Sequence, residues 1–252
     1  MKIKLSVVLS NYNEKENLER GVLEQMYQYL SKVKYPWEVI INDDGSTDGG
    51  DKLIEEFVKD HRGFKMIHGS HGGKATGIWN GIQAAKGEVV LFTDMDQSTP
   101  LKEVEKLLPW FEQGYDVVYG SRGKMRKNFP WYRQVTSWGF RVFRGIFILK
   151  DVVDTQCGFK AMRLSLAKEI FPRLSVIRDK STAKGWKVSA YDVEMLFLAE
   201  KLGSKLKEVD VVWRNEDTST GKDHNFVSES IDMLKQILQV KINDLKGNYD
   251  KK

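Results

Sequence analysis

Two carboxylates separated by one residue lie in the first half of the 252-residue chain, directly after a short apolar run. They are Asp94 and Asp96, in the segment TDMDQSTP. At a junction between a strand and a loop, this spacing lets both carboxylates approach one hard divalent cation. Mg²⁺ and Mn²⁺ favour oxygen ligands, and Mg²⁺ usually keeps water and substrate phosphates in its shell. The pair is therefore a candidate metal site, although the same pattern is common in solvated turns and helix caps.

A second acidic cluster, NDDGSTDGG, places Asp43 and Asp44 at the end of another apolar run. One interpretation is a β-turn and a helix cap, in which Gly45 supplies a positive φ and Ser46 or Asp48 caps the next helix. That interpretation does not explain two adjacent carboxylates at the end of an apolar strand. Such a pair is costly unless it is solvated or bonded to a partner, and the base and ribose of a nucleotide would be one.

Strand-like and helix-like patterns alternate along the first half of the chain. This alternation predicts βαβ units and an α/β fold with a mostly parallel sheet flanked by helices. Pro100 is compatible with the first turn of a further helix. We expect strands at Ile3–Leu9, Val39–Ile41, Glu88–Phe92 and Asp116–Tyr119, and helices at Glu14–Leu30, around residues 53–58 and at Ala75–Ala85, with a glycine-rich loop at His68–Gly73.

The predicted strands explain why the acidic clusters belong together. Three polar segments, SNYNE, NDDGSTDG and TDMDQ, each follow a predicted strand. Ligands of open α/β sheets collect at the carboxyl ends of the strands, so these three segments should line one crevice. That convergence makes metal binding at Asp94 and Asp96 much more plausible than the pair alone would.

Composition limits the kind of protein. Hydrophobic residues make up 41% and charged residues 30% of the chain, which is typical of one large globular α/β domain. No apolar run approaches the roughly 20 residues that span a bilayer, and the N-terminal apolar stretch reads as a strand rather than a signal peptide. The single cysteine, Cys157, excludes an internal disulfide. We expect a cytoplasmic protein.

The net charge of +5 is unevenly distributed. Residues 121–150 contain eight Lys or Arg residues and no acid, and aromatic residues such as Trp131 and Trp138 lie among them. This composition suits an amphipathic helix in a membrane interface, and equally a helix that packs on the sheet. The lack of acids favours peripheral association with a membrane surface, which a second amphipathic stretch, Ile231–Leu245, could assist.

The motifs together resemble those of a known family. SVVLSNYNEKENL, EVIINDDGSTDGG, GEVVLFTDMDQSTP and VVYGSRG resemble, in order and spacing, the successive motifs of family 2 glycosyltransferases. DVVDTQCGFKAMR and SAYDVEMLFLAEKLG resemble the polyprenyl- and dolichyl-phosphate hexose synthases within it, most closely the dolichyl-phosphate glucosyltransferases. The resemblance runs from about Ile3 to Trp213. It implies a GT-A domain over residues 1–215, followed by a C-terminal loop and amphipathic helix over 216–252.

The resemblance also implies roles for individual residues. It divides the domain into a donor half, about 1–120, and an acceptor half, about 121–215. The acceptor phosphate would be held by Arg122 and Arg133, which with Asp96 and Asp192 form the expected catalytic set. A Mg²⁺ or Mn²⁺ ion would lie at Asp94 and Asp96. The residues expected to bind the donor nucleotide are Ser10, Asn11, Tyr12, Glu14, Asp43, Asp44, Lys74, Asp94 and Met95.

The implied reaction moves a hexose from a nucleotide sugar, with UDP-glucose favoured, to a polyprenyl phosphate such as dolichyl or undecaprenyl phosphate. Direct displacement by the phosphate would invert the anomeric centre. Because that phosphate is already anionic, a general base is less necessary than for a sugar hydroxyl. Two alternatives stay open: GDP-mannose as the donor, and a sugar hydroxyl as the acceptor with Asp192 as the base.

Two other classes of function fit less well. A nucleic-acid-binding protein could use the basic aromatic segment, but the three acidic strand ends would be unexplained, so no nucleic-acid partner is expected. A dehydrogenase is disfavoured because no G-x-G-x-x-G follows the first strand.

Overall fold

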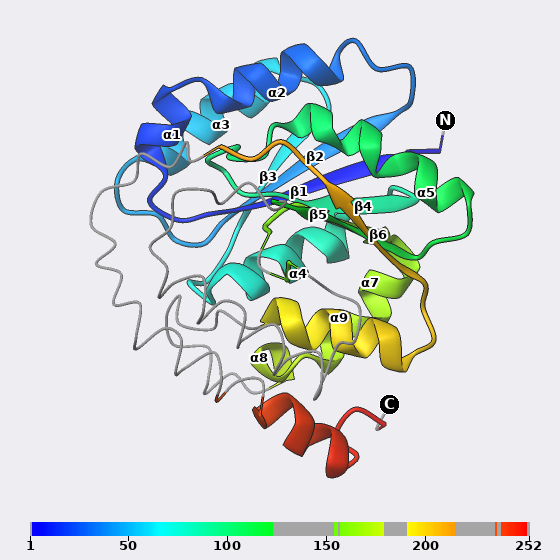
Figure 1. Ribbon diagram of the computed structural model, residues 1–252. Helices are drawn as coiled ribbons and strands as arrows, with labels where there is room; N and C mark the ends of the chain where they lie inside the picture. The colour runs from blue at the N-terminus through cyan, green and yellow to red at the C-terminus, as the bar shows by residue number, and fades with distance from the viewer. Residues whose placement is uncertain are drawn as a thin grey trace, which may run out of the picture.

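A seven-stranded sheet runs through the centre of the computed structural model, which describes residues 2–122, 154–155, 157–178, 191–214, 235 and 238–250 (Figure 1). The strand order is β3-β2-β1-β4-β6-β5-β7. The strands are β1 (Leu5–Asn11), β2 (Trp37–Asp43), β3 (Phe64–His68), β4 (Val89–Phe92), β5 (Val117–Ser121), β6 (Lys160–Arg163) and β7 (Leu206–Asp210).

The sheet is mostly parallel, as the alternating pattern predicted. β1 pairs in parallel with β2 and β4, β2 with β3, and β5 with β7. β6 is the exception, because it lies antiparallel between β4 and β5. The carboxyl ends of β1, β2 and β4 consequently meet at one edge of the sheet, where ligands of open α/β sheets bind.

Helices cover both faces of this sheet (Figure 1). Helices α1, α2 and α3 lie above it in the view of Figure 1, and α4, α7 and α9 lie below it. The helices are α1 (Lys15–Glu19), α2 (Val22–Leu30), α3 (Gly50–Asp60), α4 (Lys74–Ala84), α5 (Leu108–Glu112), α7 (Leu164–Ile170), α8 (Ser175–Arg178) and α9 (Tyr191–Lys201), with 3-10 turns η1 (Leu101–Lys106) and η2 (Phe171–Arg173).

Two of the predicted helices differ from the observed ones. The single helix expected over Glu14–Leu30 is broken into α1 and α2, because Gly21 adopts a left-handed conformation with φ of 80°. Pro100 does precede a helical segment, but that segment is the 3-10 turn η1, and α5 follows it. Apolar spacing alone does not reveal such a break, since the buried positions of α2 continue the same stripe.

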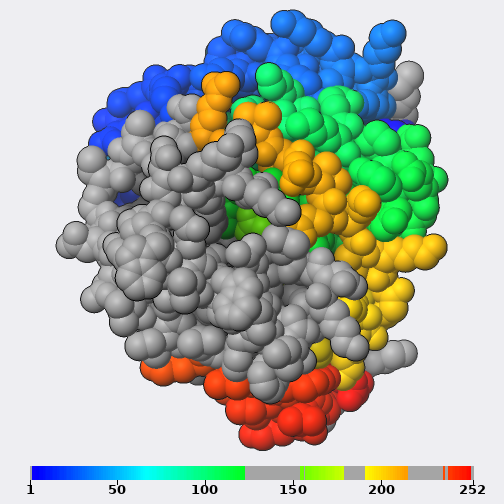
Figure 2. Space-filling view, viewed as in Figure 1, coloured from blue at the N-terminus to red at the C-terminus, as the bar shows by residue number. Residues whose placement is uncertain are grey.

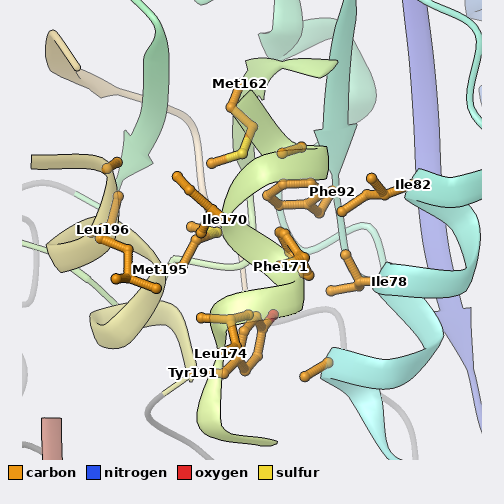
Figure 3. Packing of buried hydrophobic residues seen from close by; sticks show 14 of the residues in the cluster. Ile78, Ile82, Phe92, Met162, Ile170, Phe171, Leu174, Tyr191, Met195 and Leu196 are labelled. Atoms are coloured by element: carbon orange, nitrogen blue, oxygen red, sulfur yellow. The ribbon is translucent and has the colours of Figure 1, made fainter. Parts of the chain in front are cut away.

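Two apolar clusters form the core, one on each face of the sheet. β1 contributes to both, with Val8 on the α4 face and Val7 and Leu9 on the opposite face. Figure 3 shows the α4-face cluster, in which Phe92 of β4 contacts the ring of Phe171, with centroids 5.5 Å apart. Burial on both faces explains why the central strands read as nearly continuous apolar runs.

Helix α9 carries buried residues all along its length, including Val193, Met195 and Leu196. Residues 238–245 are also helical, and this C-terminal helix packs beside α8 and α9 through Tyr249, which is 1% exposed. Within the described residues, no helix is both long enough and apolar enough to cross a bilayer. The predicted division at residue 215 stays a prediction, as residues 215–234 lie outside the described part of the chain.

Candidate active site

The ends of β1 and β2 form the first part of the site. Asn11 and Asp43 are register partners at the last position of each strand. The Asn11 amide donates to Asp43 Oδ1 at 2.7 Å and to Ser46 Oγ at 3.0 Å, and Asp43 Oδ2 accepts from the backbone N–H groups of Gly45 and Ser46. The turn is therefore as predicted, with Gly45 at a φ of 84°, but the N-cap of α3 is Gly49 rather than Ser46 or Asp48. Asp43 orders the turn, and it does so at the edge where a ligand would bind.

Asp44 organises the glycine-rich loop that precedes α4. Its carboxylate is completely buried and accepts from the backbone N–H groups of Gly72 and Gly73 at 2.9 and 2.7 Å. The ring of His71 lies tilted against the ring of Tyr12, which follows β1, with the ring centroids 4.5 Å apart. These contacts hold the His68–Gly73 loop against the ends of β1 and β2. In the predicted acidic pair, Asp43 thus orders the turn and Asp44 orders the loop.

Lys74 begins α4 and forms an ion pair with Asp94, which follows β4. Burial by itself would lower the pKa of Lys74, but the charges of Asp94, Tyr191 and Asp192 raise that pKa above its ordinary value. Lys74 is therefore a fixed cation at neutral pH. It connects the α4 loop with the acidic pair, and its predicted contact with the donor stays a prediction.

Gly158 lies directly against the carboxylate of Asp94. A Cβ atom at position 158 would lie 1.9 Å from Asp94 Oδ2, far inside contact distance. Only glycine permits this approach, in which the segment entering β6 packs on the carboxylate. Asp94 is thereby positioned by Lys74 on one side and by the Gly158 backbone on the other.

Asp96 has a separate environment. Its two carboxylate oxygens accept from the backbone N–H and the hydroxyl of Ser98 at 2.8 and 2.9 Å, and its carbonyl accepts from Arg20 at 2.6 Å. Met95 between the two acids is 2% exposed and belongs to the apolar core. Asp94 and Asp96, the residues on either side of Met95, are therefore directed away from the core. The Met95 side chain faces the core, so only its backbone could contact a donor.

The donor set fits a hard divalent cation. The described residues contain no group of three or more His, Cys, Asp and Glu side chains arranged to hold a metal. Asp94 and Asp96 would thus supply two carboxylates and leave most positions to phosphate oxygens and water, which is how Mg²⁺ is commonly bound. A metal shared with the donor requires no complete protein cage.

The remaining donor-binding predictions lie at the same edge. Ser10 is buried on β1, and its Oγ has no hydrogen-bond partner among the described residues. Glu14 is 9% exposed and accepts from the amide of Asn17 at 2.6 Å, so it fixes the start of α1. Both are close in sequence to Asn11 and Tyr12. Whether any of these side chains contacts a donor stays a prediction.

On the predicted acceptor side, Arg122 follows β5 and is bound by a carboxylate. Its Nε and terminal nitrogen each donate to Asp154 at 2.8 Å, and its guanidinium lies 5.8 Å from the ring centroid of Trp213. Burial would lower the pKa of Arg122, but the hydrogen bonds and charge of Asp154 raise it. Arg133, the second predicted phosphate ligand, lies outside the described residues, as do the rest of the basic aromatic segment and residues 179–190.

The Arg122–Asp154 pair makes stability depend on acid pH. Burial would raise the pKa of Asp154, but hydrogen bonds and charge from Arg122 lower it from 3.8 to about 2. In the unfolded chain, the carboxyl group of Asp154 takes up a proton at a higher pH than it does in the folded protein. The pair therefore stabilises the fold fully above about pH 4, and this stabilisation, on the order of 2 kcal/mol, disappears as the pH falls towards 2.

We expect the Asp154→Asn variant to unfold at lower denaturant than the parent at pH 6, with a gap that narrows at pH 3. Urea unfolding of both proteins at pH 6, 4 and 3 measures this difference between their unfolding midpoints. A gap that stayed constant over this range would show that the pair does not titrate as the structure indicates.

Asp192, at the start of α9, is held by a lysine that the sequence did not single out. Lys160 Nζ lies 3.0 Å from Asp192 Oδ1 and also donates to the Cys157 carbonyl, and the lysine side chain is 1% exposed. A buried ammonium requires such a counter-ion. Neighbouring Tyr191 has a strongly raised pKa because of burial and the charge of Asp192. The predicted catalytic Asp192 is thus part of a buried ion pair.

Three contributors to this site were missed: Lys160, Gly158 and Asp154. All lie in the segment DVVDTQCGFKAMR, which was recognised only as a motif. β6 reads KAMR, with a charged residue at each end, so its local pattern did not mark Lys160 as buried. Glu194, two residues after Asp192, faces different partners, because its carboxylate accepts from Ser175 and Tyr249.

Comparison with known proteins agrees with this geometry. Residues 6–171 match the family described as Glycosyl transferase family 2, and this chain belongs to that family. The match spans the donor loops, the acidic pair and β6. The resemblance expected from the motifs is therefore confirmed.

Similar curated proteins are dolichyl-phosphate beta-glucosyltransferases. The one from Dictyostelium discoideum is 31% identical over 97% of this chain and 76% of its own length. The one from Mus musculus is 30% identical over 83% of this chain and 67% of its own length. The Saccharomyces cerevisiae protein of the same name is 28% identical over 97% of this chain and 76% of its own length.

Solved structures share the fold. A glucosyl-3-phosphoglycerate synthase from Mycobacterium tuberculosis, in complex with Mn²⁺, uridine-diphosphate and glucosyl-3-phosphoglycerate, aligns with a TM-score of 0.66 at 18% identity over 95% of this chain and 80% of that one. A Pyrobaculum calidifontis mannosyltransferase in complex with GDP-Man and Mn²⁺ aligns with a TM-score of 0.65 at 17% identity. This alignment covers 96% of this chain and 65% of the mannosyltransferase. The GT-A fold expected from the sequence is confirmed.

Proposed function

We propose that this protein transfers a hexose from a nucleotide sugar, UDP-glucose first among the candidates, to a polyprenyl phosphate. The observation that carries the proposal is the position of Asp94, held between Lys74 and Gly158 at the edge where β1, β2 and β4 end. The names of the curated relatives, dolichyl-phosphate beta-glucosyltransferases, support the same donor sugar and acceptor class.

Each part of the site has a task in this reaction. Asn11, Asp43 and the loop ordered by Asp44 would bind the nucleoside. Mg²⁺ or Mn²⁺ at Asp94 and Asp96 would neutralise charge on the departing diphosphate. Lys74 lies beside Asp94 as a second, permanent positive charge for the same diphosphate.

Arg122 is the described residue best placed for the acceptor phosphate. It is already charged, oriented by Asp154 and adjacent to the half-exposed indole of Trp213. A guanidinium fixed in this way binds a phosphate oxygen in one orientation, which favours direct displacement and inversion. The attacking phosphate oxygen needs no deprotonation, which is consistent with Asp192 being paired to Lys160.

The test is a transfer assay with a panel of donors. The protein is incubated with Mn²⁺ or Mg²⁺, a short-chain polyprenyl phosphate in detergent, and UDP-glucose, GDP-mannose or another UDP-sugar. We expect a glycolipid with UDP-glucose and no product in EDTA. A product formed only from GDP-mannose would correct the donor, and the absence of product with every donor would refute the proposal. Methyl glucoside in place of the lipid tests the hydroxyl-acceptor alternative.

A further inference from the structure

The C-terminal helix exposes an apolar ridge to solvent. Leu238, Ile242 and Leu245, which we call the C-terminal ridge, are 47%, 42% and 77% exposed. Their spacing of four and three residues places them on one face of the helix over residues 238–245. Figure 2 shows this helix at the lower surface of the molecule, in red. Three exposed branched side chains in one row are unusual on a surface that contacts only water.

The opposite face of the helix is fixed to the domain. Asn243 donates to Ser175 Oγ at 2.9 Å, Tyr249 OH donates to Glu194 at 2.7 Å, and Lys201 pairs with Asp244 at 2.7 Å. Val240 is 4% exposed on the same inner side. Rotation of the helix to bury the ridge would break all of these contacts. The exposed row is therefore a fixed feature of the fold.

Lysines flank the ridge on both sides. At about 100° per residue, Lys246 lies about 40° from Ile242 on one side, and Lys241, which pairs with Asp244, lies about 40° from Leu245 on the other. The acidic Asp244 lies away from the ridge, where Lys201 and Lys241 neutralise it. An apolar row bordered by cations matches a surface with an apolar interior and anionic head groups.

We propose that the C-terminal ridge docks this protein on anionic lipid bilayers, with the leucines and isoleucine in the acyl boundary and the lysines among the head groups. A second copy of the chain fits this face less well, because a two-fold contact through the ridge would bring the lysines of both copies together. The inference deepens the proposed function, on which it rests for the presence of a lipid acceptor.

The anchoring contacts also connect the ridge to the active site. Glu194, which accepts from Tyr249, lies two residues after Asp192 on the first turn of α9. The helix that docks and the turn that bears Asp192 are thus joined through a buried hydrogen bond. Docking would hold the acceptor side of the site in a fixed orientation to the bilayer.

Vesicle binding without acceptor or donor tests the docking. The parent protein should float with vesicles of phosphatidylcholine and phosphatidylglycerol, and bind pure phosphatidylcholine more weakly. Serine at all three ridge positions should lower the partition coefficient on anionic vesicles by tenfold or more. Leu245→Ser compared with Leu202→Ser, an exposed leucine just after α9, is the matched single pair, and only Leu245→Ser should weaken binding.

The lysines provide an independent measurement. Lys246→Gln should reduce binding to anionic vesicles and flatten its dependence on salt. Circular dichroism and thermal unfolding check that every variant is folded, as expected for exposed positions. Unchanged binding by the triple ridge variant would overturn the proposal. A concentration-dependent dimer that the triple variant abolishes, with vesicle binding intact, would instead assign the ridge to a second copy.

Transfer assays separate this inference from the proposed function. The triple variant should keep parental transfer to a short-chain polyprenyl phosphate in detergent and lose most transfer to the same acceptor embedded in vesicles. If the parent protein binds vesicles through the ridge but transfers no sugar in either format, docking stands and the proposed function fails. If transfer in vesicles survives loss of the ridge, docking through this helix fails and the proposed function stands.

Discussion

Alanine at Asp94 or Asp96 is expected to reduce hexose transfer by at least about a hundredfold, because each change removes one of the two carboxylates proposed to hold the metal on the donor diphosphate. Asp94→Ala also removes the ion-pair partner of Lys74, whose side chain is only partly exposed. Asp96→Ala removes the acceptor of the Ser98 backbone N–H and hydroxyl groups. The two variants should therefore differ in stability, with Asp94→Ala the less stable, while both lose activity.

Steady-state transfer at saturating Mn²⁺ and thermal unfolding measure these effects together. Asp60→Asn, an exposed acid at the end of α3, is the matched control and should be active. The isosteric Asp96→Asn keeps the side-chain volume, so its loss of transfer would point to charge rather than packing. Retention of transfer within threefold of the parent in both alanine variants would contradict the assigned role of the pair.

The second large effect is expected from Gly158→Ala. The added methyl group would lie 1.9 Å from Asp94 Oδ2, so either the carboxylate or the backbone entering β6 must move. A displacement of about 1 Å in a catalytic site can cost on the order of a hundredfold in rate. We expect transfer to fall by roughly this factor and the requirement for Mn²⁺ to rise, because Asp94 would no longer be fixed opposite Asp96.

A matched alanine substitution distinguishes the site effect from general strain. Gly81→Ala in α4 would place a Cβ atom 2.3 Å from Val8 Cγ1 in the core, a comparable overlap far from the acidic pair. It should lower the unfolding temperature while folded molecules keep the parental Mn²⁺ dependence. If Gly158→Ala merely lowered stability in the same manner, Gly158 would not position Asp94.

Much of the donor side followed from local sequence patterns. The strands before Asn11, Asp43 and Asp94 were predictable because each is a short apolar run that ends in polar residues, and parallel strands bring such ends together. Lys74 was singled out by the family resemblance rather than by a local pattern. The contacts within the site were not predictable in the same way: that Asp44 binds Gly72 and Gly73 depends on how two loops fold against each other.

The acceptor side was harder to predict because its contacts join distant parts of the chain. Gly158 meets Asp94, and Lys160 meets Asp192, across long separations that leave no periodic pattern. β6 has only four residues and lies antiparallel in a sheet that is otherwise parallel, so the alternation of strands and helices gave no sign of it. The roles predicted for Arg133 and for the basic aromatic segment stay predictions.

The position of β6 has a consequence for biosynthesis. The neighbours β3, β2, β1 and β4 all come from residues 5–92, so most of the donor side is complete in the chain long before its last residues are translated. The other edge of β4 pairs with β6, about 70 residues later, where Phe92 opposes Lys160. Until the ribosome has released that segment, β4 is an unpaired apolar edge, the kind of surface on which nascent chains aggregate or recruit chaperones.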